Sequence, residues 1–115
     1  MYIANETFIV EASESARFET WIQNQISLIE KGEGSIMTTL PGVNLTTLRL
    51  ARVVDIPGDP EFSQHAASYS LQVECTDRNI ANDWLNDVMK HLIDDFTTMF
   101  PQNAMAFPSI MQILH

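Results

Sequence analysis

Apolar and polar positions along this chain form a strand, a helix and a strand, and then the same order again. The six predicted elements are, in chain order, Tyr2–Val10, Glu14–Ile29, Leu48–Val54, Tyr69–Cys75, Asp77–Met99 and Met105–Leu114. A βαββαβ order is typical of the ferredoxin-like fold, in which two helices pack on one face of a four-stranded antiparallel sheet. We therefore predict an α+β protein of this type, built as a single domain over residues 1–115.

The two middle strands of such a sheet predict which face meets the helices. In the strand Tyr69–Cys75 every second residue is apolar, and Ser70, Gln72 and Glu74 fill the alternate positions. In the strand Tyr2–Val10 one phase is apolar except at Glu6, and the other phase mixes aliphatic and polar residues. The sheet should therefore have one apolar face and one mixed face.

Both helices show an apolar stripe at helical spacing. In the first helix the stripe is Phe18, Ile22, Ile26 and Ile29. In the second it is Ile80, Ala81, Trp84, Leu85, Val88, Leu92, Phe96 and Met99, widened on one flank by Met89, Ile93 and Phe100. The wide flank indicates either ordinary burial or a contact between subunits. Ser13 is the expected N-cap of the first helix, and Thr76 or Asp77 that of the second.

Three further features concern the connections and the last strand. The stretches Gly32–Thr47 and Ile56–Ala67 are long for a compact domain, and each is either a functional flap or an insertion. Pro108 lies inside the last predicted strand. Because proline cannot donate to a β-ladder, we expect an edge strand or a bulge there.

The charge balance excludes two classes of partner. The chain has 15 acidic and 6 basic residues and a net charge of −9. Nucleic acids and anionic membrane surfaces both require clustered Lys and Arg, so we expect neither partner. No apolar run is long enough to cross a bilayer and no export signal is evident, so we expect a cytoplasmic protein. The single cysteine, Cys75, ends an apolar strand phase and is expected to be a buried hydrophobe.

Signatures of metal or covalent chemistry are weak. Asp87, His91 and Asp95 follow one side of the second helix at i, i+4 and i+8. Eight residues of helix span about 12 Å, so the three cannot hold one ion, and a solvated acidic face is the better interpretation. Phosphate loops, nucleophile elbows and zinc motifs do not occur in the sequence. We expect no metal and no cofactor.

The mixed sheet face is the preferred candidate site. Its polar positions are Asn5, Thr7, Arg49, Ser70, Gln72 and Glu74, and its aliphatic positions are Ile3, Ile9, Ala51 and Val53. A second subunit packed there would bury the aliphatic residues and enclose the polar ones in a pocket. Alternatively, the polar side chains only bridge the two subunits. His65, in the loop before the third strand, is a further candidate for such a ligand site.

Four segments resemble a known family: Met1–Thr7, Trp21, Tyr69–Cys75 and Ala106–Leu114. Together they resemble DUF4286, a family of small bacterial proteins of unknown function. The resemblance implies a ferredoxin-like fold of the dimeric α+β barrel type in a bacterial cytosolic protein. Since the family has no assigned reaction, it implies no catalytic residue. The stretches Gly32–Thr47 and Ile56–Ala67 are longer here than the family's usual connections.

These observations lead to three hypotheses. The first is a homodimer that binds a ligand or a partner without catalysis. The alternative is an enzyme of the dimeric α+β barrel class, a cofactor-independent oxygenase or isomerase acting on a small organic molecule, which rests on fold analogy. The third is a regulatory module that recognises a protein through an exposed sheet edge or through Gly32–Thr47. The sequence alone leaves open whether the chain is an enzyme.

Overall fold

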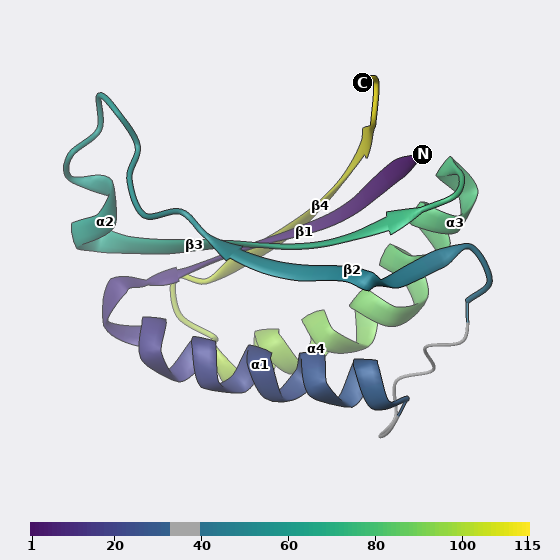
Figure 1. Ribbon diagram of the computed structural model, residues 1–115. Helices are drawn as coiled ribbons and strands as arrows, with labels where there is room; N and C mark the ends of the chain where they lie inside the picture. Colours follow the sequence, from purple (N-terminus) through teal and green to yellow (C-terminus); the bar gives the residue numbers. More distant parts are fainter. Residues whose placement is uncertain (33–39) are drawn as a thin grey trace.

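The predicted ferredoxin-like architecture is confirmed by a computed structural model that describes residues 1–32 and 40–115 (Figure 1). The strands are β1 (Tyr2–Glu11), β2 (Val43–Arg52), β3 (Ala66–Cys75) and β4 (Met105–Gln112). The helical elements are η1 (Ala12–Glu14), α1 (Ser15–Lys31), α2 (Phe62–His65), α3 (Arg78–Asp83), the π turn η2 (Trp84–Val88) and α4 (Met89–Met99). All strand pairs are antiparallel and the order is β2-β3-β1-β4.

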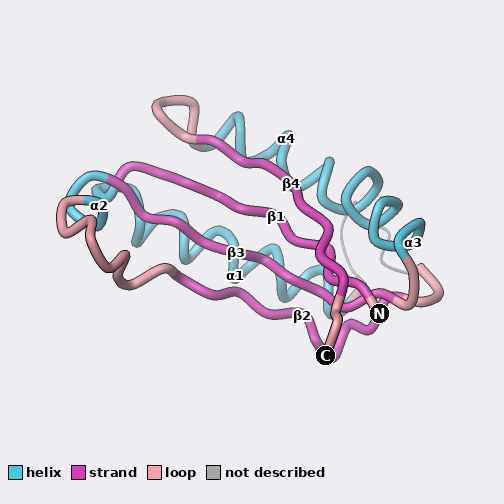
Figure 2. The backbone as a smooth tube through the Cα atoms, turned by 90° about the horizontal axis from the view of Figure 1, so that it is seen from above, coloured by secondary structure: helices cyan, strands magenta, loops and turns pink. Residues whose placement is uncertain are grey.

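The long helices cover one face of the sheet and leave the other face open. In Figure 1 α1 and α4 lie beneath the strands, and in Figure 2 the open face is seen from above with the helices behind it. The two central strands, β1 and β3, hold most of the buried strand residues. Five of the six polar positions predicted on the open face therefore lie on the two most deeply buried strands, and Arg49 lies on the edge strand β2.

An aromatic cluster joins the helices to the sheet. Phe8 of β1 lies 5.4 Å from Phe18 of α1 and 5.0 Å from Phe96 of α4, measured between ring centroids. Phe18 and Phe96 meet edge to face at 5.8 Å. Such geometry adds to the free energy gained by burying the rings. The predicted stripe of α1 is buried as expected at Phe18, Ile22 and Ile29.

The second long helix is interrupted by a π turn at Trp84–Val88, which the sequence pattern did not predict. Met89 and Phe100, which widened its apolar stripe, are both core residues, with 0 % and 4 % of their surface exposed. Burial within one chain therefore accounts for these two residues, and Ile93, the third residue of that flank, is partly buried against the core.

Of the two helix caps predicted from the sequence, one is absent in the structure and one is present. Ser13 was expected to cap the first helix, but it lies inside η1, and Glu14 occupies the N-cap position of α1 without a side-chain bond. The 3-10 turn uses the residues that the cap would need, so this prediction was wrong. Asp77 does cap α3, since its carboxylate accepts a hydrogen bond from the Ile80 backbone N–H at 2.9 Å.

The long connections are partly structured. β2 begins at Val43, five residues before the predicted start, and a register shift lies between Asn44 and Arg49. The short helix α2 lies within Ile56–Ala67. The part of the first connection at 33–39 lies outside the described residues. Within the described ranges no helix is long and apolar enough to cross a membrane.

Candidate functional site: a polar row across the open sheet face

One transverse row of polar side chains crosses all four strands. The register places Arg49 of β2 opposite Gln72 of β3, Gln72 opposite Asn5 of β1, and Asn5 opposite Ser109 of β4. Paired residues share a face of the sheet, and Asn5 is out of phase with the buried Ala4 and therefore lies on the open face. The strand order thus gathers four residues that are far apart in the chain, with Asn5 and Ser109 separated by 104 positions.

Hydrogen bonds link this row into one network. The Nε and Nη2 atoms of Arg49 donate to the Gln72 carbonyl oxygen at 3.3 and 3.1 Å. The side-chain amide of Gln72 donates to the Ser70 hydroxyl at 2.9 Å, and the Ser70 hydroxyl donates to the side-chain carbonyl oxygen of Asn5. The Asn5 amide then donates to Thr7 and to Ser109, both at 3.1 Å.

Asn5 is the centre of this network and is only 6 % exposed. Both of its amide hydrogens and its carbonyl oxygen are used within the sheet, which fixes the orientation of the side chain. Within this network, unused donor capacity remains on the exposed Arg49 guanidinium, on the Gln72 side-chain amide and on the hydroxyls of Thr7 and Ser109. They are suited to an oxygen acceptor on a ligand, such as a carbonyl or a carboxylate.

Apolar side chains surround the polar row on the same face. The register puts Phe107 beside Thr7, Met111 beside Ile3 and Met105 beside Ile9. Phe107 is 46 % exposed, Met111 39 % and Met105 55 %. Large apolar side chains left exposed around a polar centre are typical of a surface that contacts another molecule.

The structure brings together four of the six predicted site residues: Asn5, Thr7, Arg49 and Gln72. Glu74 lies one row away, opposite Ile3. His65 ends α2, is exposed, and precedes Gln72 by seven residues, or about 23 Å of extended strand. Ser109 was not predicted as a site residue. Because Pro108 obscured the phase of β4, only the pairing with Asn5 reveals its place.

Glu6 of β1 interrupts the apolar phase of its strand, and the sequence assigned it no role. Glu6 lies on the helix-facing side and is 1 % exposed, and neither carboxyl oxygen finds a hydrogen-bond partner among the described residues. Burial raises the pKa of Glu6 to about 7. In the sequence, this buried carboxyl is indicated by an acidic residue within the apolar phase of a central strand.

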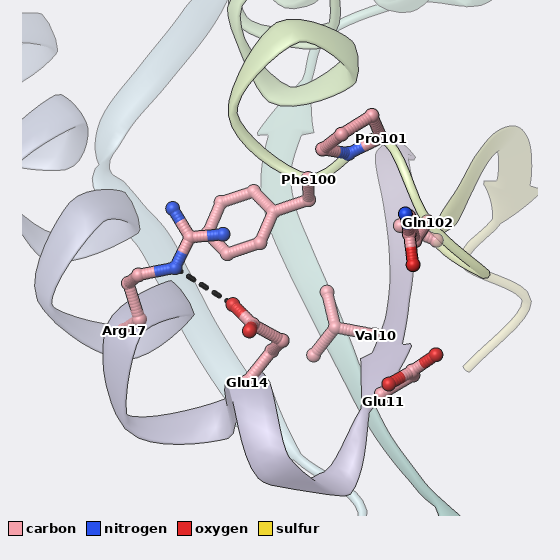
Figure 3. A pocket seen from close by; sticks show the side chains of 8 residues that line it. Val10, Glu11, Glu14, Arg17, Phe100, Pro101 and Gln102 are labelled. Atoms are coloured by element: carbon pink, nitrogen blue, oxygen red, sulfur yellow. Dashed lines mark hydrogen bonds and ion pairs between the residues drawn. The ribbon is translucent and has the colours of Figure 1, made fainter.

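A pocket of about 220 Å³ lies where β1 runs into α1 and where α4 ends. Figure 3 shows the Arg17 guanidinium against the Phe100 ring, 4.2 Å from its centroid, with the Glu14 carboxylate on its Nε at 2.7 Å. Arg17 also donates to the Met99 carbonyl oxygen at 2.8 Å. These contacts join the ends of two helices, and we interpret Arg17 as a structural clamp.

Residues 1–32 and 40–115 contain no cluster of three or more His, Cys, Asp or Glu arranged to hold an ion. Cys75 is fully buried as predicted, and burial raises the pKa of its thiol. A thiol with a raised pKa is a poor nucleophile.

Comparisons with known proteins support the fold. The chain resembles a mutant of SnoaB, a cofactor-independent oxygenase from Streptomyces nogalater, with a TM-score of 0.53 and 9 % identity over 99 % of this chain and 94 % of SnoaB. It also resembles a protein of unknown function from Nitrosomonas europaea, with a TM-score of 0.51 and 9 % identity over 99 % and 92 % of the two chains. At these identities the likeness shows the fold alone.

The sequence comparisons are more specific. No curated protein matches the chain. The family described as a domain of unknown function, DUF4286, matches residues 1–114, which is nearly the whole length. The segments that suggested this family, including the first strand and Trp21, lie within that match. The chain therefore belongs to the DUF4286 family.

Proposed function

We propose that this chain is a homodimeric binding domain whose two copies pack their open sheet faces together and hold a small ligand between the polar rows. The observation that carries the proposal is the hydrogen-bonded row from Arg49 to Ser109, surrounded by exposed apolar side chains. A face with an apolar rim and an internally bonded polar centre loses little on desolvation, because most of its polar groups are already paired.

The charge distribution favours a second copy of the chain as the partner. The three central rows of the face carry one cation, Arg49, and one carboxylate, Glu74, whereas the whole chain carries −9. Identical chains therefore repel each other least when they approach through this face. Such a contact is self-complementary under a two-fold axis, the commonest symmetry of protein dimers.

In this dimer Asn5, Thr7, Arg49, Gln72 and Glu74 line the enclosed space. Arg49 and the hydroxyls of Thr7 and Ser109 offer donors to an oxygen-bearing small molecule. We assign His65 no contact with the ligand, since it lies beyond the end of these rows.

The oligomeric state tests the proposal directly. Light scattering coupled to size-exclusion chromatography at micromolar concentration should give twice the chain mass of 13.0 kDa. Replacing Phe107 by Glu places a charge within the apolar rim and should give a monomer. The matched control Val54→Glu changes a residue that is 81 % exposed and lies beyond the end of β2, and it should remain a dimer. A monomeric wild-type protein would contradict the proposal.

A second candidate function is a cofactor-independent oxygenase. It is favoured by the fold match to SnoaB over 94 % of that chain. Oxygen consumption in the presence of electron-rich phenols, measured against a protein-free reaction, tests this candidate. A rate equal to the protein-free rate with every phenol would count against it and would leave the binding proposal unaffected.

A further inference from the structure

A groove runs along the outer edge of the sheet, on the side opposite to the proposed dimer face. It has a volume of about 350 Å³ and lies between the helix run α3–η2 and strand β4. Its lining residues are Arg78, Asn82, Leu85, Asn86, Pro108, Ser109 and Ile110. A neighbouring hollow of about 230 Å³ shares Arg78 and Ile110 and extends the groove toward Tyr2 and Gln112. Figure 2 shows β4 as the edge strand nearest this helix run.

The buried carboxyl of Glu6 lies one strand inward from this groove. Glu6 is paired with Pro108, which lines the groove, and paired residues point to the same face of the sheet. Cross-strand partners have Cβ atoms roughly 5 Å apart, a distance that a Glu side chain can span.

Glu6 lacks a structural partner. Both oxygens are buried without a hydrogen bond to any described residue, although a buried polar group normally has one. Burial is the cause of its raised pKa, and no neighbouring charge of the described chain offsets the cost of ionisation. An unpaired carboxyl beside a groove is the arrangement expected of a site whose partner arrives with a ligand.

The helix wall of the groove is also unusual. α3 contacts both β1 and β4, and the π turn that follows it contacts β1. The groove residues Leu85 and Asn86 belong to this π turn. π turns occur frequently at functional sites, because the extra residue changes which side chains face a given position.

We propose that this groove binds a small organic cation with a planar N–H head, an amidine, which reaches the Glu6 carboxylate between Pro108 and Leu85. Two parallel N–H groups match the two oxygens of a carboxylate. Leu85, Pro108 and Ile110 offer apolar contact to the body of the ligand, and Asn82 and Asn86 offer amide groups at the rim. Arg78 lines both the groove and the neighbouring hollow, and its charge disfavours a second positive charge on the ligand.

The net charge of −9 favours such a ligand over an anion. The groove shares Ser109 with the polar row, but Glu6 lies on the helix-facing side of the sheet, away from the proposed dimer contact. A monomeric protein can therefore still bind the cation, and a dimer can lack this site.

Benzamidine is a suitable probe, and benzoate is the control of similar shape and opposite charge. We expect benzamidine to shift the side-chain amide resonances of Asn82 and Asn86 in a saturable way, with a Kd of about 1 mM, the range reached by small fragments. Benzoate should bind at least tenfold more weakly. In the complex the pKa of Glu6, followed through its carboxyl carbon resonance, should fall below its value in the free protein.

Two variants complete the test. Glu6→Gln keeps the shape but removes the charge, and it should weaken benzamidine binding at least tenfold. Asn86→Trp fills the groove from an exposed position and should also abolish binding. Because this variant leaves Glu6 in place, it tests the groove even if a change at Glu6 alters the core. Equal binding by wild-type protein and E6Q, a preference for benzoate, or no saturation up to about 10 mM benzamidine would each overturn the proposal.

Discussion

Glu6 is the residue whose chemistry agrees least with its surroundings. It occupies the helix-facing phase of β1 between Ala4 and Phe8, both fully buried. An unpaired carboxyl there lowers the stability of the fold, and it does so more strongly when it is ionised. Because the folded protein binds this proton more tightly than the unfolded chain, stability should depend on pH through this group.

The pH dependence can be predicted with its sign. The pKa of Glu6 is about 7 in the folded protein, against an ordinary value of 4.5 that we take for the unfolded chain. The free energy of unfolding therefore falls as the pH rises from about 4.5 to 7, and above that range this group changes it no further. The full loss is about 3 kcal/mol. We expect Glu6→Gln to remove this part of the pH dependence. Urea unfolding of both proteins at pH 5 and pH 8 measures it.

The expected result is a stability difference in favour of E6Q that grows by about 2.5 kcal/mol between these pH values, because part of the full loss has already occurred at pH 5. Glu30→Gln is the control, since Glu30 is exposed near the end of α1 and should leave the dependence of the wild-type protein in place. Parallel pH profiles for wild-type and E6Q would mean that Glu6 finds a partner in solution.

At the scale of elements, the π turn explains why the second helix looked too wide in sequence. Buried residues recur every fourth position from Trp84 to Phe100. In a regular α-helix each such step rotates by about 40°, so four steps would carry Phe100 far around the helix from Trp84. The extra residue in Trp84–Val88 absorbs part of this rotation, and both halves of the helix face the sheet.

If the π turn absorbs the rotation between the two halves of the helix, deleting a residue inside it and deleting one outside it should have different effects. Removing exposed Asn86 from the π turn should convert it to α-helix and leave both halves in phase. Removing exposed Asp94 from α4 should instead rotate Phe96 and Phe100 by about 100° away from the core. We expect the Asn86 deletion to keep a cooperative thermal transition and the Asp94 deletion to lose it. Circular dichroism during heating measures both, and equal damage by the two deletions would contradict the account.

The strand period of two residues and the helix period of about 3.6 residues predicted most of the fold. The alternation in Tyr69–Cys75 predicted both faces of β3, and Asp77 caps α3, as its residue type before a helical pattern indicates. At Ser13 and at Trp84–Val88 the backbone forms a 3-10 turn and a π turn, and the regular α-helical period used for prediction contains neither pattern.

The candidate site was predictable only in part. Strand phase identified Asn5, Thr7, Arg49 and Gln72 as residues of one face. Their order across the sheet, and the place of Ser109, depend on the register of β4, which the sequence pattern does not determine. The role of Asn5 as the centre of the network likewise follows from three-dimensional pairing.

The whole molecule is a flat two-layer body, with principal extents of 41, 35 and 19 Å. A sheet covered on one side only leaves Phe107, Met105 and Met111 exposed on the other. A second copy on that face would give a four-layer assembly with the helices outside. In that assembly most of the acidic residues lie away from the contact, on surfaces separated by the thickness of both copies.

This arrangement predicts an unusual response to salt. Two copies of −9 together carry −18, so association is opposed by repulsion between distant charges. The Debye length falls from about 30 Å at 0.01 M salt to about 10 Å at 0.1 M. Since each copy is 19 Å thick, this range of salt screens the outer charges from one another but leaves the apolar contact unchanged. The dimer should therefore become tighter, with Kd lower by about tenfold, as estimated from screening.

Sedimentation equilibrium at the two salt concentrations measures this change. The direction discriminates between kinds of interface, because a contact held by ion pairs weakens as salt is added. Arg49→Gln provides a second check: if Arg49 mainly binds Gln72 within its own sheet, the variant should show the same salt response as the wild-type protein. A Kd that rises with salt would mean that opposite charges, rather than the rim around Phe107, hold the two copies together.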